Sequence, residues 1–245
     1  MLKLLTSKQP DVPDSTPFGC KIRSAAAAYG LTEPFEQFWA QDGGTVVARI
    51  DDEAVLVEGE RTDTDELRAF LRTLDLKALS CEAETAEHLG IPVSARGEIM
   101  VLHPQNIDRR TLADVVYDPG PREIYSLLEQ AQSKTFPVPE FEPFYMDLSF
   151  RTRHRAALTA GVRQGGRLAA CALCLAITER AAVISAVACV PGLRLHGYGR
   201  TAVTALVTKL RRDNMYLFRA ENENEAFYRK LGFEPYGFWA EYRRP

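Results

Sequence analysis

The segment 190–203 reads VPGLRLHGYGRTAV and joins two apolar patterns of different period. Residues 182–189 before it are almost wholly apolar, as in a buried strand, and residues 198–211 after it carry apolar side chains at helical spacing. A strand that turns directly into a helix presents backbone N–H groups without partners, and the helix dipole adds positive charge there. The segment therefore predicts an anion-binding turn that suits a phosphate.

Two glycines and two arginines support this interpretation. Gly197 and Gly199 have no Cβ, so the backbone can approach a pyrophosphate closely, and Arg194 and Arg200 add charge beside it. The motif is not a Walker A loop, because no Gly-Lys-Ser/Thr follows it. It is not a full dinucleotide fingerprint either, because Ala202 stands at the third glycine position. On the turn alone, a tight strand–helix connection without a ligand stays an alternative.

The rest of the second half alternates strands and helices. We expect strands at 168–177, 182–189, 215–219 and 238–242, and helices at 122–133, around 151–158, at 198–211 and at 224–231. The proline-rich segment 136–143 predicts an ordered, extended loop.

The first half follows a similar order. It predicts strands at 38–40, 45–50, 54–57, 76–80 and 98–102, and helices at 24–29, from 62–65 to 74, and at 83–89. Each half places Leu-Gly-apolar after its short helix, as Leu89-Gly90-Ile91 and Leu231-Gly232-Phe233. The shared order predicts a duplicated unit, with domains at 1–110 and 111–245.

Two motifs in the second half resemble the GNAT superfamily of N-acetyltransferases. Arg194-x-x-Gly197-x-Gly199 is similar to its Gln/Arg-x-x-Gly-x-Gly/Ala signature, and residues 224–233 resemble its later helix, which usually ends Tyr-x-x-x-Gly-Phe. The resemblance covers 145–245 well. It implies an α/β (α+β) fold with a mixed, mostly antiparallel central sheet and flanking helices. Together with the repeated order, it predicts two tandem GNAT-like units, the first of them degenerate.

The resemblance also implies a cosubstrate and its site. Acetyl-CoA would lie where the parallel strands 182–189 and 215–219 part, with Tyr228 as proton donor to the leaving thiolate. Asn222 or Asn224 would reach the cofactor, although Glu221 stands at the family's usual asparagine position. The implied contacts to pantetheine and pyrophosphate are Ala188, Cys189, Val190, Arg194, Leu195, His196, Gly197, Tyr198, Gly199 and Arg200.

The general base is left open by the sequence. Many relatives carry an acid on the strand that corresponds to 181–189, where this chain has only the hydroxyl of Ser185. A water chain, Glu179, Glu241 or an acid from the first half are the alternatives. We expect no metal, because His88, His103 and His154 are isolated and lack ligand spacing.

The first half lacks both chemical features at the corresponding places. Residues 58–66 contain one glycine and five acids, which would repel a pyrophosphate, and Ala86 stands where Tyr228 would correspond. We expect this half to pack against the active one and to form a wall of the acceptor site.

Bulk properties narrow the class of protein. The net charge of -3 gives no field for nucleic acid, and no run approaches the roughly 18 apolar residues that span a membrane. The five cysteines do not suggest a disulfide framework, and Cys171 and Cys174 would face opposite sides of a strand as core residues. We expect a cytoplasmic protein.

The expected function is acetyl-CoA-dependent transfer of an acetyl group to a primary amine of a small molecule or peptide, by direct attack. The alternatives are a non-catalytic acyl-CoA-binding or regulatory protein and a structural interaction protein that keeps only the fold. The amine acceptor is not identified, and the oligomeric state, including a homodimer, stays open.

Overall fold

The computed structural model describes residues 1–107, 114–133, 136–221 and 223–244. The chain forms two compact units that interleave along the sequence. Unit 1 contains Met1–Met100, Phe218–Glu223 and Pro235–Pro245, and unit 2 contains Val101–Leu217 and Asn224–Glu234. The assignment of contiguous domains to 1–110 and 111–245 stays a prediction, whereas the compact units exchange short segments near the C-terminus.

Unit 1 is a sheet in the order β1-β2-β3-β4-β5-β12-β6. The pairs with a described register are antiparallel except β4 and β5, which are parallel. The last strand of the chain therefore pairs with β5, a strand of the first half. The strands are β1 (Lys3–Leu4), β2 (Glu36–Gln41), β3 (Thr45–Ile50), β4 (Glu53–Val57), β5 (Ala78–Glu82), β6 (Ala95–Leu102) and β12 (Glu234–Arg243).

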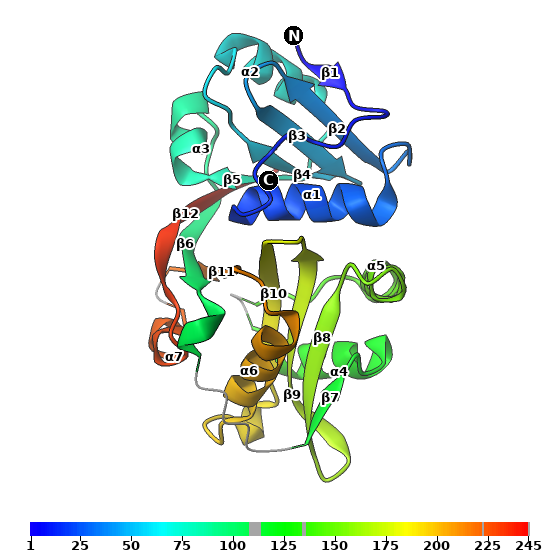
Figure 1. Cartoon of the computed structure of the whole chain (residues 1–245), viewed down its shortest axis with the longest axis vertical. Helices are drawn as coiled ribbons and strands as arrows, with labels where there is room; N and C mark the ends of the chain where they lie inside the picture. The colour runs from blue at the N-terminus through cyan, green and yellow to red at the C-terminus, as the bar shows by residue number, and fades with distance from the viewer. Residues whose placement is uncertain (108–113, 134–135, 222, 245) are drawn as a thin grey trace. The chain divides into compact units, whose positions relative to one another are not determined.

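Helices cover both faces of the sheet of unit 1, because successive side chains of β3 point to opposite faces and those on both faces are buried. Val46 and Ala48 pack in one core cluster with Ile22 and Ala26 of α1, whereas Val47 packs in another with Leu67 of α2. Figure 1 shows α1 running beside β2–β4. The helices are α1 (Pro17–Tyr29), α2 (Thr64–Thr73) and α3 (Ala83–Leu89).

The start of α1 differs from the sequence prediction, which placed a short helix at 24–29 after an irregular segment. The helix begins at Pro17, because proline suits the first helical position and Thr16 caps it, its hydroxyl accepting the N–H of Gly19 at 3.2 Å. Its end at Tyr29, before Gly30 with φ 91°, agrees with the prediction.

Unit 2 is a sheet in the order β11-β10-β9-β8-β7. Its neighbours are antiparallel except β10 and β11, which are parallel. The strands are β7 (Val115–Tyr117), β8 (Leu158–Gln164), β9 (Arg167–Ile177), β10 (Ala181–Cys189) and β11 (Asn214–Ala220). The helices are α4 (Pro121–Ala131), α5 (Phe141–Arg153), α6 (Tyr198–Leu210) and α7 (Glu225–Lys230), with 3-10 turns η1 (Pro104–Asn106) and η2 (Pro191–Leu193).

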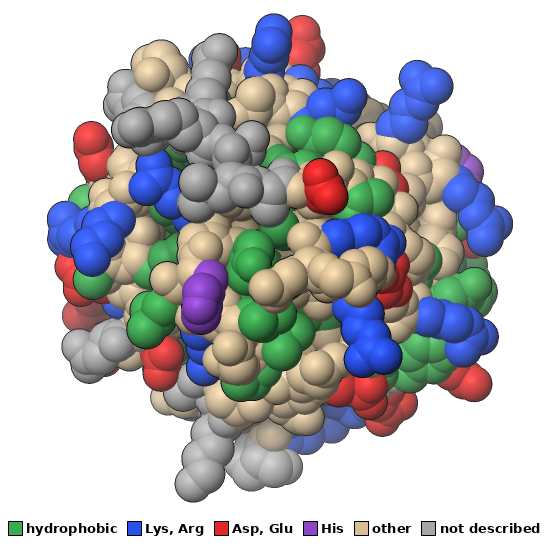
Figure 2. All heavy atoms as spheres, turned by 90° about the horizontal axis from the view of Figure 1, so that it is seen from below, with side chains coloured by type: hydrophobic (Ala, Val, Ile, Leu, Met, Phe, Trp, Pro, Cys, Tyr) green, Lys and Arg blue, Asp and Glu red, His purple; other side chains and the backbone are tan. Residues whose placement is uncertain are grey.

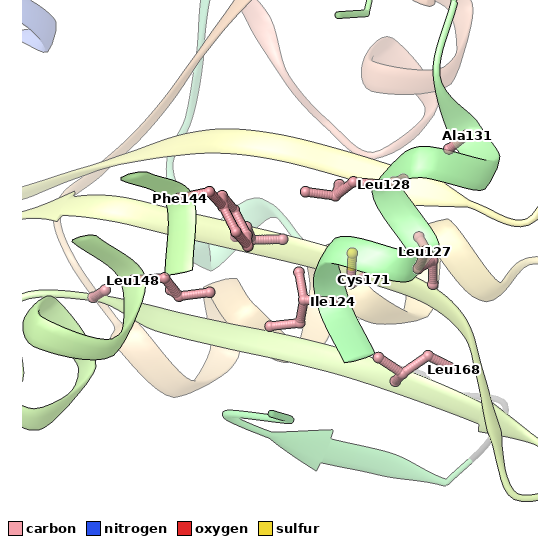
Figure 3. Close-up of a cluster of buried hydrophobic side chains, with 11 residues drawn as sticks. Ile124, Leu127, Leu128, Ala131, Phe144, Leu148, Leu168 and Cys171 are labelled. Atoms are coloured by element: carbon pink, nitrogen blue, oxygen red, sulfur yellow. The ribbon is translucent and has the colours of Figure 1, made fainter. Parts of the chain in front are cut away.

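One part of the core of unit 2 lies between the sheet and the helices α4 and α5, and α6 buries Ala202, Val203, Leu206 and Val207 against the same sheet. Ile124, Leu127 and Leu128 of α4 meet Phe144 and Leu148 of α5 above β9 (Figure 3). Cys171 and Cys174 are both buried and neither forms a disulfide, as expected of core cysteines.

Two predictions in this unit are wrong. The helix expected at 151–158 is α5, which begins at Phe141 and ends at Arg153, and the strand β8 follows. Pro143 suggested a loop, but it is the third residue of α5, where its missing N–H is not needed. Gly161 makes β8 hard to recognise from sequence. A Cβ there would lie 2.6 Å from Leu168 Cδ2, so glycine, a poor strand former, lets this side chain keep its place.

The fold class is confirmed, with a mixed, mostly antiparallel sheet and flanking helices. Among the described residues, no helix has the length and apolar character needed to cross a bilayer. The face shown in Figure 2 has hydrophobic side chains near its centre, with both basic and acidic side chains around them.

Candidate functional site

The parallel strands β10 and β11 run side by side over only part of their length. Their register extends from Ala181↔Asn214 to Ile184↔Leu217. Beyond this last pair β10 continues to Cys189 in register with β9 alone. The half of β10 after Ile184 is also the more exposed half, whereas residues 181–184 are buried. An open strand edge therefore begins at Ser185, as the resemblance implied for 182–189 and 215–219.

The turn at the end of β10 leaves backbone donors available. After η2, Leu195 and Gly197 have positive φ values of 67° and 83°, and α6 begins at Tyr198 without a side-chain cap. The N–H groups of Leu195, His196 and Gly197 have no acceptor among the described residues. The first helical N–H groups have none within a helix by geometry. This arrangement fits the phosphates of a nucleotide cofactor.

The side chains of this turn lie at the surface. Arg194, Leu195 and His196 are exposed, and His196 Nδ1 lies 2.8 Å from the carbonyl oxygen of Arg194. This contact supports the turn and leaves the imidazole in solvent. A Cβ on Gly199 would lie 3.7 Å from the ring of Phe227, an ordinary contact distance. Packing against Phe227 therefore does not require a glycine here, and the contact of Gly199 with a cofactor stays a prediction.

Of the three predicted pantetheine contacts, Ala188 and Cys189 on β10 and Val190 directly after it, two have their N–H groups directed to β9. The N–H of Val190 donates to the carbonyl oxygen of Ala169 at 2.9 Å. N–H groups alternate along an antiparallel strand, so that of Ala188 points to β9 as well. Cys189 and Val187 therefore direct their N–H groups to the open edge. Val187 was missed by the sequence reasoning, which had no register to work from.

Cys189 is half-buried at the end of β10. Burial raises the pKa of its thiol, and the charge of Arg194 lowers it in part. The thiol donates to the carbonyl oxygen of Val190 at 3.6 Å. Both observations describe a neutral thiol at neutral pH, not a nucleophile.

Tyr228 lies on α7 between two aromatic rings. It makes edge contacts with Phe227 and Phe233, whose ring centroids are 5.0 and 5.8 Å away. Burial raises the pKa of Tyr228 to about 12. The phenol therefore stays protonated throughout the neutral range, where it can donate a hydrogen bond but cannot act as a phenolate base.

The other residues that the sequence suggested for cofactor binding or as the base are Asn222, Asn224, Glu179 and Glu241. Asn222 lies outside the described residues. Asn224 is exposed, has φ 55° and precedes α7. Glu179 is exposed in the turn before β10, at the other end of the strand from the anion-binding turn. Glu241 lies on β12 in unit 1, where it accepts from Ser80 and pairs with Arg243.

Unit 1 repeats the parting of two parallel strands, since β4 and β5 are in register only from Glu53↔Ala78 to Val55↔Ser80. The turn after β4 is not an anion site, however. The N–H of Gly59 donates to the hydroxyl of Thr45, and a Cβ on Gly59 would lie 2.1 Å from the carbonyl oxygen of Gly43. The turn thus packs on the β2–β3 hairpin. This is a structural reason, beyond the repulsive acids, why it cannot hold a phosphate.

A cavity of about 430 Å³ also lies in unit 1, between leucines and three arginines. None of its lining residues belongs to the predicted acetyl-CoA site. We therefore place the candidate site at the open edge of β10 and the turn that follows it, where backbone N–H groups lack acceptors among the described residues. Among the described residues, no group of three or more potential ligands is arranged to hold a metal ion.

Comparison with known proteins identifies a family for part of the chain and similar folds for most of it. Residues 122–233 match the model of the Acetyltransferase (GNAT) family. No curated protein matches the sequence. A GCN5-related N-acetyltransferase from Kribbella flavida is 17% identical with a TM-score of 0.65, over 92% of this chain and 95% of that one.

Two further solved structures extend over almost the whole chain. A tandem GNAT protein from the clavulanic acid biosynthesis pathway is 15% identical with a TM-score of 0.61, covering 98% and 97% of the two chains. A GCN5-related N-acetyltransferase from Sphaerobacter thermophilus is 12% identical with a TM-score of 0.60, covering 99% and 95%. At these identities the similarity establishes the fold, and the family model covers the turn and Tyr228. Residues 122–233 of this chain are therefore an acyltransferase domain of the GNAT family.

Proposed function

We propose that this protein transfers an acetyl group from acetyl-CoA to a primary amine of a small molecule or peptide. The observation that carries the proposal is the continuity of the site within unit 2. The open edge of β10 leads directly into a turn in which the N–H groups of Leu195, His196 and Gly197 have no acceptor among the described residues. Both lie inside the segment that matches the family model.

The chain's own groups suit this reaction. N–H groups of the turn, from Leu195 onward, and the charge of Arg194 hold a pyrophosphate. The N–H groups of Val187 and Cys189 face a pantetheine arm extended along β10. When bound, acetyl-CoA supplies the acetyl thioester. Asn224 and Arg200 complete the proposed contacts, and residues 111–245 are the proposed catalytic domain, with 1–110 as its degenerate partner.

The transfer itself forms a bond between the amine nitrogen and the carbonyl carbon, and breaks the carbon–sulfur bond. The amine proton leaves to water or to a base that the site does not identify. Tyr228 donates a hydrogen bond to the leaving sulfur. Because the pKa of Tyr228 is about 12 and that of a thiol about 8.5, a hydrogen bond is favoured over complete proton transfer.

A non-catalytic acyl-CoA-binding protein is the second candidate, and one observation favours it. Within 181–189 no side chain is acidic, so the base that many relatives carry there is missing. The two candidates share the binding site and differ only in turnover. The proposed cytoplasmic location rests on composition and on five free cysteines, which suit a reducing compartment.

An acetylation assay separates the two candidates. Purified protein is incubated with acetyl-CoA and a panel of small amines and peptides, and both CoA release and the acetylated product are followed. Enzyme-dependent product with at least one amine supports the transferase. Tight acetyl-CoA binding with no product from any amine contradicts it and supports the non-catalytic candidate.

A further inference from the structure

The ladder between β9 and β10 contains a local distortion. Val183 pairs with Ala176 before it and Ala186 with Leu173 after it, whereas Ile184 between them pairs with Cys174. One residue of each strand, Leu175 and Ser185, is left out of the register. The two irregularities cancel, so the same register holds on both sides. A straight ladder could therefore run through this point, and the rest of the sheet does not impose the distortion.

Side chains satisfy both backbone groups of Leu175. Its N–H donates to Ser185 Oγ at 3.3 Å, and its carbonyl oxygen accepts from Arg151 Nη1 at 3.0 Å. The bond to Ser185 lies at the surface, whereas the bond to Arg151 is partly buried, where an unpaired carbonyl would be costly. The distortion is thus held by a hydroxyl from β10 and a guanidinium from α5.

Arg151 is itself an unusual residue for this place. It is 7% exposed, and its Nε donates to Asp147 Oδ1 at 2.7 Å one turn earlier on α5. A buried guanidinium is expensive to desolvate unless it is paired and fully hydrogen-bonded. Two of its bonds are accounted for by Asp147 and by the displaced carbonyl of Leu175. The hydrophobic contacts of α5 do not require an arginine at this position.

The distortion lies where the site opens. Ile184 is the last residue of β10 in register with β11, and Ser185 is the next. A bulge bends its strand and increases the twist, so its place and angle determine the direction of the strand beyond it. That part of β10 contains Val187 and Cys189, the residues whose N–H groups face the open edge.

We propose that Arg151 and Ser185, with Asp147 behind them, form a clamp that positions the open half of β10 for acetyl transfer. The inference rests on the proposed function. These are positioning residues that act through the backbone of Leu175. Without the clamp the ladder straightens, and the donors of Val187 and Cys189 move relative to the anion-binding turn.

Three variants test the clamp. Ser185→Ala removes the acceptor of the Leu175 N–H, Ser185→Thr retains a hydroxyl, and Ser149→Ala removes a half-buried hydroxyl on α5 outside the clamp. The measurements are kcat, the acetyl-CoA Kd, the melting temperature and amide exchange of Leu175 by NMR. Because a small misplacement of reacting groups can cost about 100-fold in rate, we expect Ser185→Ala to lower kcat by about 10- to 100-fold.

The other readouts separate positioning from a structural role. In Ser185→Ala, the amide of Leu175 should exchange more slowly, because in a straight ladder its N–H donates to β10, while the melting temperature changes little because the straight ladder replaces the clamp. Ser185→Thr and Ser149→Ala should retain kcat within about 3-fold. A wild-type kcat in Ser185→Ala, or unchanged exchange at Leu175, overturns the clamp. If wild type binds acetyl-CoA but acetylates nothing, the proposed function fails, and the positioning role falls with it even where the exchange result holds.

Discussion

Ile184 of β10 lies opposite Leu217 of β11, and this is the last pair before the two parallel strands separate. In unit 1 the corresponding last pair is Val55↔Ser80 of β4 and β5. The opening between β4 and β5 differs chemically from the opening between β10 and β11. Directly after β4, Glu58 Oε1 lies 2.6 Å from His88 Nδ1 of α3, and Gly59 donates to Thr45. The groups that would meet a cofactor there are bonded within unit 1.

Acetyl-CoA should consequently bind with a stoichiometry of one per chain. The turn after β10 has unpaired donors, whereas the turn after β4 has none to spare at Gly59 and carries acids. Isothermal titration calorimetry of the wild-type protein measures this directly. Binding of two acetyl-CoA molecules per chain would contradict this expectation, because it would show that unit 1 also holds the cofactor.

Tyr228→Phe should lower kcat by about 100-fold if the phenol assists the leaving sulfur. The control is Tyr198→Phe, which removes a hydroxyl from α6 but keeps the backbone N–H that the site uses. The control should retain kcat within about 2-fold. Equal rates for wild type and Tyr228→Phe would remove Tyr228 from the mechanism.

The pH dependence gives a second check on Tyr228. Its protonated form is the one needed, and burial raises its pKa from 10 to about 12. The raised pKa extends the protonated range upward, so activity should not fall between pH 9 and about pH 10.5, where an ordinary tyrosine would lose its proton. A decline in kcat with an apparent pKa near 10 that is absent in Tyr228→Phe would contradict the buried environment.

Leu195→Gly should leave the protein as stable as wild type or more stable, by up to about 1 kcal/mol. Leu195 is fully exposed with φ 67°, so its side chain gains no burial. The left-handed conformation costs about 1–2 kcal/mol for a residue with a Cβ, and glycine costs about 0.5–1 kcal/mol in chain entropy. Urea denaturation measures the difference. The control Leu193→Gly, at a half-buried position with negative φ, should destabilise the protein. A decrease of more than 1 kcal/mol in the free energy of unfolding of Leu195→Gly would refute backbone strain at Leu195.

Glu98→Gln should destabilise unit 1 strongly. Glu98 of β6 pairs with Arg219 of β11, and the two side chains are 13% and 9% exposed. Removal of one charge from a buried pair costs about 3–5 kcal/mol, because the other charge stays buried. The neighbouring pair Arg96–Glu221 is 70% and 53% exposed, so Glu221→Gln should cost at most about 1 kcal/mol. Equal effects in denaturant titrations would contradict the distinction.

Much of the local structure could be predicted because its signals are local. The strand at Thr45–Ile50 and the helix at Ala83–Leu89 are as predicted, one from period-2 alternation and the other from Gly90 at its end. The helix at 141–153 was predicted about ten residues too late, because Pro143 indicated a loop where the helix begins. The pairing of β12 with β5 could not be predicted, since the pattern of a strand does not identify its neighbour.

The candidate site could also be predicted only in part. The turn at 194–200 and Tyr228 were identified from motifs, and their roles stay proposals. The N–H of Val190 proved to be engaged with Ala169, and Val187 was missed, because both depend on strand register. Ser185, the one hydroxyl on an apolar strand, was the only sequence signal of the distortion. Leu175 and Arg151 gave none.

The most direct test of the central claim is titration of acetyl-CoA into wild type, Arg194→Glu and Arg180→Glu. Arg194 is exposed in the anion-binding turn, and Arg180 is an exposed arginine in the turn at the opposite end of β10, so both variants carry the same change in charge. We expect the affinity for acetyl-CoA to be at least about 10-fold lower in Arg194→Glu, or 1.4 kcal/mol, and unchanged in Arg180→Glu. Wild-type affinity in Arg194→Glu, or no binding by the wild-type protein, would contradict this expectation.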